Sequence, residues 1–178
     1  MERLYYPCVL RMNGADVFVV WYQEDRDGFV RQPDGHLLHA RSLEGLASAA
    51  TEMGLSLVPE EPARYDFDQL REWCVGADGS GVNYRAFLNA WNFFDDLARF
   101  HDEPDSDYAK LSRSAQQSYD KLFWGNNIPA ITPPGERFTP VWSTEELEEI
   151  RQVMQAGLKL VVAELPPVEG PPRTSRCT

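Results

Sequence analysis

Residues 8–22 have the sequence Cys-Val-Leu-Arg-Met-Asn-Gly-Ala-Asp-Val-Phe-Val-Val-Trp-Tyr. Two apolar runs flank Asn13-Gly14, and an Asn-Gly pair accepts the positive φ angles that a type I′ hairpin turn requires. The second run, residues 17–22, is almost continuously apolar, which indicates a central strand covered on both faces. This stretch therefore predicts two paired antiparallel strands at the start of the fold.

The surrounding sequence predicts the rest of a small antiparallel sheet. Short strands are expected at residues 29–31 and 36–40, on either side of a Pro33-Asp34-Gly35 turn. Ser42 is the expected cap of a helix over residues 43–53. Residues 55–58 alternate like a fifth strand. Residues 1–62 are therefore predicted to form a β-meander with one helix.

Beyond residue 62 the spacing of apolar residues is helical. A helix is expected over residues 67–75, with Asp66 as its cap, and a stronger one follows Asn83. Another is expected over residues 108–123 with Asp107 as its cap, and Ser143 and Glu146 form a capping box before the last. The predicted fold class is α+β: an N-terminal antiparallel β-meander with one helix, followed by three or four packed helices.

The length of 178 residues fits one domain. We expect a single α+β domain over residues 1–165, with a sheet part over about residues 1–62 and a helical part over about residues 63–165. Residues 166–178 contain four prolines and no apolar period. They are predicted to be a flexible tail.

The chain is strongly acidic. Asp and Glu number 28 against 17 Lys and Arg, giving a formal net charge of −11, while 43% of the residues are hydrophobic. A chain this apolar is expected to fold, and its charge disfavours nucleic acid and anionic membranes and favours basic partners. There is no CxxC pair, no signal-peptide core and no apolar run long enough for a membrane span, so a cytoplasmic protein is expected.

The excess acid is clustered in two segments. Residues 95–107 carry six acids and one base, and residues 144–149 add four glutamates and no base. Such runs are most often solvated faces, but they are also the expected attachment points for a basic partner. We predict the first segment as the partner-binding face and Glu145, Glu148 and Glu149 as the second choice.

Catalytic chemistry has no recognisable motif in this sequence. Gly79-Ser80-Gly81 is not a nucleophile elbow, and neither phosphate-binding glycine motif occurs. The acids at 105–116 lack the glycine and the final glutamate of a calcium loop. No catalytic residue, metal ligand or cofactor is predicted, although acids distant in sequence could still meet in the fold.

Two apolar features have open interpretations. Phe93 and Phe100 fall off the main stripe of their helix, so they either pack beneath the sheet or form an apolar centre ringed by acids. Residues 126–142 form a long proline-containing loop. Long loops inside compact domains are often functional, yet these prolines also suit a passive connector.

Three segments carry a resemblance to known proteins: residues 5–14 (YYPCVLRMNG), 88–97 (LNAWNFFDDL) and 119–127 (YDKLFWGNN). On these the chain resembles small acidic proteins of high-GC actinobacteria, over most of its length up to residue 165. That group implies no catalytic residues. In size, acidity and lack of motifs the chain is also similar to immunity proteins of bacterial toxin systems.

The functional prediction is a non-catalytic acidic protein that neutralises a basic protein partner, most concretely an immunity protein or antitoxin against a nuclease-like toxin. Nuclease sites are basic because they bind a polyanion, and an acidic protein can occlude them. The predicted contact residues are Asp95, Asp96, Phe100, Asp102, Glu103, Asp105 and Asp107. Neither nucleic acid nor membrane is expected as a partner, and the oligomeric state stays open.

Two alternatives belong to other classes. One is a small enzyme or ligand-binding domain with a pocket between sheet and helices, near Trp21, His39, Trp124 and Asn126. The other is a structural subunit of a larger complex, which an exposed apolar patch would indicate.

Overall fold

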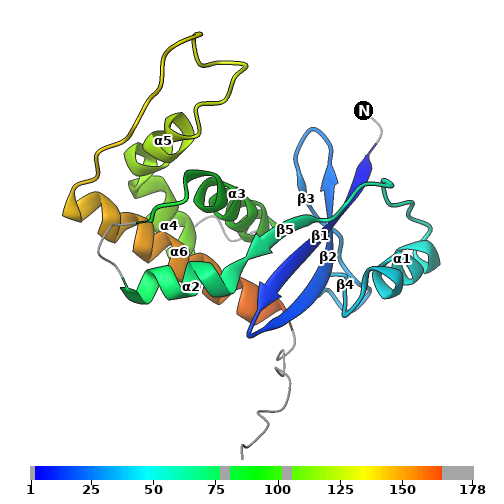
Figure 1. The fold of residues 1–178 in the computed structure, drawn as a ribbon. Coiled ribbons are helices and arrows are strands. Elements are labelled where there is room, and N and C mark those ends of the chain that lie inside the picture. Colours follow the sequence, from blue (N-terminus) through cyan, green and yellow to red (C-terminus); the bar gives the residue numbers. More distant parts are fainter. Residues whose placement is uncertain (1–2, 77–80, 102–105, 166–178) are drawn as a thin grey trace, which may run out of the picture. The chain divides into compact units, whose positions relative to one another are not determined.

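A computed structural model describes residues 3–76, 81–101 and 106–165 of the chain (Figure 1). The chain divides into two compact units. The first comprises residues 1–68 and 162–178, and the second comprises residues 69–161. The fold is α+β, with an N-terminal sheet and one helix followed by a set of packed helices, which confirms the predicted class.

The sheet of the first unit is built around the predicted hairpin. Strands β1 (Leu4–Met12) and β2 (Ala15–Gln23) pair antiparallel, with Leu10 opposite Val17. Asn13 and Gly14 have φ angles of 50° and 74°, as a type I′ turn requires. The short strands β3 (Gly28–Phe29) and β4 (His39–Ala40) both pair with β2, which confirms its central place.

The sheet is mixed, whereas the sequence predicted an antiparallel one. Strand β5 (Ala63–Asp66) pairs parallel with β1, and the strand order is β3-β2-β1-β5. The predicted strand at residues 55–58 is wrong: Leu57 makes only an isolated parallel bridge to Tyr5. Because residues 63–66 extend the sheet, the first unit continues to Asp68, past residue 62.

Helix α1 (Leu43–Glu52) covers one face of this sheet. The Ser42 side chain accepts a hydrogen bond from the Gly45 amide, so the predicted cap is confirmed. Leu46 and Ala50 pack against Val20 in a cluster that also holds Val30 and Leu38. Burying these side chains supplies the hydrophobic stabilisation of this face.

The hairpin turn is fixed by a carboxylate of helix α2 (Phe67–Gly76). The amides of Asn13 and Gly14 each donate a hydrogen bond of 2.7 Å to the Asp68 carboxylate, one to each oxygen. The acid therefore satisfies two turn amides and ties the tip of the hairpin to the first turn of the helix.

The second unit is helical. It is formed by residues 69–76 of α2, by α3 (Tyr84–Phe100), α4 (Asp107–Ser114) and α5 (Gln116–Gly125), and by residues 144–161 of α6 (Thr144–Glu164). The Asn83 cap and the Ser143–Glu146 capping box are confirmed by their hydrogen bonds.

The region predicted as one helix after Asp107 is two helices. The cap is Ser106, whose hydroxyl accepts from the Ala109 amide, so Asp107 is instead the first helical residue. Helix α4 ends at Ser114, and α5 starts at Gln116, so Ala115 is the junction between them. The buried Ala115 shows why this break left no sequence signal, since an alanine at the junction continues a helical pattern.

The core of the second unit depends on a close approach between α3 and α6. A Cβ added at Gly157 would lie 2.1 Å from Cδ2 of Phe94, so only glycine fits against the fully buried ring. No helix in the described part of the chain is long and apolar enough to cross a membrane.

Candidate functional site

The first of the predicted contact acids, Asp95, is half-buried in the helical unit. Its Oδ1 accepts hydrogen bonds from the hydroxyls of Tyr108 (2.8 Å) and Ser112 (3.0 Å). Ser112 in turn accepts from Trp91 Nε1 at 2.9 Å. Burial raises the pKa of Asp95, and the two hydroxyl donors only partly offset it. Asp95 thus links α3 to α4 through a hydrogen-bond network.

Asp96 and Phe100 are buried on α3. Asp96 is 9% exposed and forms an ion pair with Arg99 one turn later. Phe100 is 8% exposed. Neither side chain therefore offers much surface to a partner.

Asp107 is the one predicted contact residue of this segment that the described structure places at the surface. It lies in the first turn of α4, where a negative charge is favourable beside the helix N-terminus. Asp102, Glu103 and Asp105 lie outside the described residues.

The second-choice acids at the start of α6 are partly engaged within the unit. Glu149 accepts a hydrogen bond of 2.7 Å from the fully buried Ser118 hydroxyl. Glu148 forms an ion pair with Arg151. Glu145 is exposed and remains available for contact with a partner.

The alternative pocket residues belong to two different units. Trp21 and His39 lie in the first, on one sheet face, because His39 is paired with Val19 two residues before Trp21. Trp124 and Asn126 lie in the second. A pocket shared by these four residues stays a prediction. Within the described part of the chain no group of three or more His, Cys, Asp or Glu side chains could hold a metal ion.

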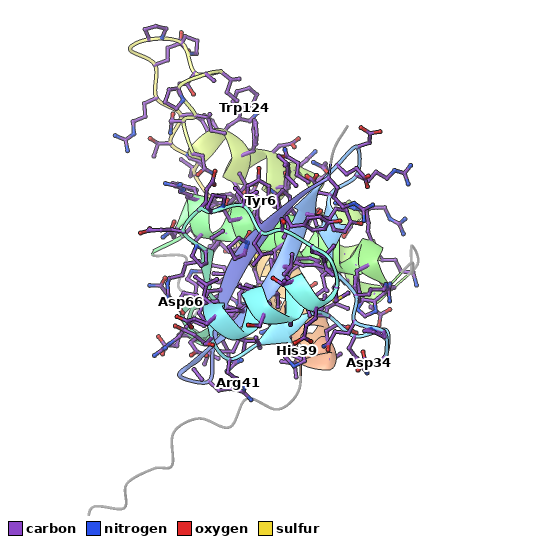
Figure 2. All side chains as sticks on the ribbon, turned by 90° about the vertical axis from the view of Figure 1, so that its right-hand side faces the viewer. Tyr6, Asp34, His39, Arg41, Asp66 and Trp124 are labelled. Carbon is purple, nitrogen blue, oxygen red and sulfur yellow. The ribbon has the colours of Figure 1, made fainter. Side chains whose placement is uncertain are left out.

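The loop that joins α5 to α6 is held in one conformation by hydrogen bonds of its own side chains. We call residues 126–142 the α5–α6 loop; it extends beyond the end of α5 in both views (Figures 1 and 2). Its two ends are joined by Asn127, whose side chain accepts from the Phe138 amide (2.6 Å) and donates to the Phe138 carbonyl (2.9 Å). Asn127 has a φ of 48°, a conformation that asparagine tolerates better than most residues.

A second set of contacts fixes the returning end of the loop. Lys121 Nζ donates to the Val141 carbonyl at 3.0 Å and lies 2.5 Å from a carboxylate oxygen of Glu146. The Trp142 ring stacks on Tyr84, with ring centroids 6.3 Å apart. Helix α5, the loop and the first turn of α6 therefore share one set of anchors.

The same loop presents apolar side chains to solvent. Phe138 is 44% exposed, Ile131 46% and Val141 84%, and Trp124 at the end of α5 is 49% exposed. Figure 2 shows Trp124 at the base of the projecting segment. We call these four residues the apolar loop surface. Sequence reasoning noted the loop but did not assign these side chains to a contact surface.

Comparisons with known proteins supply no template for this arrangement. No protein-family model, curated protein or solved structure matches the chain.

Proposed function

We propose that this chain is a non-catalytic acidic protein that binds and neutralises a basic protein partner. The most concrete form of the proposal is an immunity protein or antitoxin that occludes the basic active site of a nuclease-like toxin. A polyanion-binding site is electrostatically complementary to an acidic protein, so association would be steered by charge.

The observation that supports the proposal is the balance of charge within the molecule. Ion pairs within the described residues include Arg3 with Glu24, Arg11 and Arg64 with Asp16, Arg99 with Asp96, Lys121 with Glu146, and Arg151 with Glu148. The chain has 28 acids and 17 bases, so at least eleven acids cannot each be paired with a base of their own. This excess of acid is what a basic partner would meet.

Exposed acids occur in both units. They include Glu44, Glu52 and Glu61 in the first unit and Asp107, Glu136 and Glu145 in the second. This distribution favours steering by the net charge of the chain, in addition to any local contact.

The test is affinity capture from the lysate of the native host at low and moderate salt, followed by purification of the captured protein. We expect a basic partner whose association rate falls steeply with salt. If the partner is a nuclease, adding the chain should abolish its nuclease activity. A partner bound equally at both salt concentrations, or no partner at all, would overturn the proposal.

Two charge-reversal variants distinguish attraction of the partner by one acidic segment from attraction by the net charge of the chain. The first is Asp102→Lys/Glu103→Lys/Asp105→Lys, and its matched control is Glu44→Lys/Glu52→Lys/Glu61→Lys. Both change the net charge equally. A larger loss of affinity in the first variant would support residues 95–107 as the attracting face, and equal losses would support steering by net charge alone.

A further inference from the structure

We infer that the α5–α6 loop is the element of this protein that enters the partner, and that the partner presents an apolar pocket with a basic rim. This inference rests on the proposed function, since it takes the basic partner from it. It adds the contact surface and the chemistry of the pocket that receives it.

The first argument is that the loop is fixed before it meets a partner. Asn127 bonds both backbone groups of Phe138, and Lys121 holds the Val141 carbonyl. Turns within the loop are closed by hydrogen bonds from the Ile131 and Thr132 amides to the Ile128 carbonyl. A preorganised loop loses less conformational entropy on binding than a free one.

The second argument is the kind of side chain that the anchored loop exposes. Exposed apolar side chains lower the solubility of a protein, and a loop that only connects two helices does not need them. Aromatic side chains at the centre of an interface commonly contribute most of the binding energy. Phe138 and Trp124 are the aromatic members of the apolar loop surface and would fill the pocket.

The third argument is the charge around the apolar loop surface. Residues 120–149 contain six acids and two bases. One of these bases, Lys121, is already paired with Glu146. The other, Arg137, is exposed, but so are the three acids Asp120, Glu136 and Glu145, so the exposed charge of this segment is acidic. The complementary pocket therefore carries basic side chains at its rim. A second copy of this chain or an anionic membrane would place like charges against this acidic surround.

The test compares two triple variants of similar exposure. The loop variant is Ile131→Ser/Phe138→Ser/Val141→Ser, at positions 46%, 44% and 84% exposed. The control is Leu43→Ser/Met53→Ser/Val75→Ser, at positions 36%, 38% and 83% exposed. The probe is the purified basic protein captured by the wild-type chain. We expect the loop variant to bind it at least about tenfold more weakly and the control to bind it within about twofold.

Photo-crosslinking locates the contact independently of affinity. p-Benzoylphenylalanine is placed at Phe138 in one sample and at Leu43 in another. We expect the captured basic protein to crosslink from position 138 and not from position 43. Crosslinked peptides of the partner should contain apolar residues next to Lys or Arg.

Several outcomes would overturn the inference. They are equal affinity of the two triple variants, crosslinking from position 43 alone, crosslinking from position 138 to a second copy of this chain, or loop-dependent sedimentation with anionic vesicles. If the loop variant binds normally while charge reversal abolishes binding, the inference fails and the proposed function stands. If no basic protein binds the wild-type chain, both fail.

The variant Asn127→Gly tests preorganisation on its own, because glycine keeps the positive φ and removes the side chain that bonds Phe138. We expect several-fold weaker binding with the apolar loop surface unchanged. Wild-type affinity in this variant would overturn the role of the anchors.

Discussion

Two segments of this protein, residues 95–107 and residues 124–141, differ in how the polarity of their side chains matches their exposure to solvent. The first segment is the most acidic in the chain, yet Asp96 is buried on α3, and Asp95 is half-buried and accepts a hydrogen bond from Tyr108 of α4. The second is rich in proline and apolar residues, yet it displays Trp124, Phe138 and Val141 to solvent.

This difference teaches that charge density along a sequence does not tell which side chains the fold exposes. A carboxylate that is partly removed from water needs hydrogen-bond donors, and the half-buried Asp95 receives them from Tyr108 and Ser112. An apolar residue can stay exposed where its backbone is fixed by anchors, as Phe138 is by Asn127. The following predictions test this contrast, in order of decreasing effect.

Two phenylalanines of the second unit should differ most: Phe94, which directly precedes the acidic segment on α3, and Phe138 in the α5–α6 loop. Phe94 is fully buried against Gly157, so Phe94→Ala should lower the free energy of unfolding by about 3–5 kcal/mol. Phe138 is 44% exposed, so Phe138→Ala should change it by about 0.5 kcal/mol or less. Urea denaturation of both variants measures the difference. Equal losses would mean that the loop side chain is part of the core.

Two aspartates of the acidic segment should also differ. Asp95→Ala removes the acceptor of the Tyr108 and Ser112 hydroxyls and should cost about 2 kcal/mol of unfolding free energy. Asp107→Ala removes only a favourable charge from an exposed helix start and should cost about 0.5 kcal/mol. Thermal and urea unfolding provide the comparison. A stable Asp95→Ala protein would show that this network is dispensable.

The anchor of the loop should affect local order more than global stability. Asn127→Gly removes the bonds to Phe138 and should lower the free energy of unfolding by about 1 kcal/mol or less. Amide hydrogen exchange over residues 128–138 should accelerate, while exchange in α3 should not change. Unchanged exchange in the loop would mean that other contacts define it.

The smallest effects concern pH. Burial raises the folded-state pKa of Asp95 above its usual 3.8, so the folded protein holds this proton more tightly than the unfolded chain does. The contribution of Asp95 to the free energy of unfolding therefore falls as pH rises through its folded-state pKa. Asp95→Asn should gain stability relative to the wild type over that rise.

Glu146 is the control, because its contribution to the free energy of unfolding should depend on pH in the opposite direction. The hydrogen bond from Lys121, followed by that from the Ser143 amide, holds the pKa of Glu146 below its usual 4.5. Its stabilisation is therefore present above pH 4.5 and is lost as pH falls through the lowered value. Glu146→Gln should lose stability relative to the wild type as pH rises through the same range. Slopes of the same sign in urea unfolding from pH 3 to 7 would contradict these assignments.

The parts of the fold that follow from local patterns were predictable. Asn13-Gly14 specified the hairpin, and Ser42, Asn83 and Ser143 specified three helix starts, because turn and cap chemistry involves residues adjacent in sequence. Strand β5 was missed because Ala63-Arg64-Tyr65-Asp66 is only four residues long and half of it is charged, so its alternation is too short to indicate a strand. Its strand state depends on pairing with β1, which lies far away in the sequence.

The candidate site was less predictable for the same reason. The four-residue spacing of Asp95 from the buried Trp91 was a signal that this acid faces inward, because such residues share one helix face. The exposure of Phe138 and Val141 had no such signal. It follows from anchors at Asn127 and Lys121 that act across the loop and onto α5.

The most direct test of the central claim is hydrogen–deuterium exchange of the wild-type chain with and without its captured basic partner. Our account predicts protection of residues 124–141 on binding and unchanged exchange over residues 88–97 of α3. Protection over residues 95–107 with no change in the α5–α6 loop would contradict it and return the contact surface to the acidic segment.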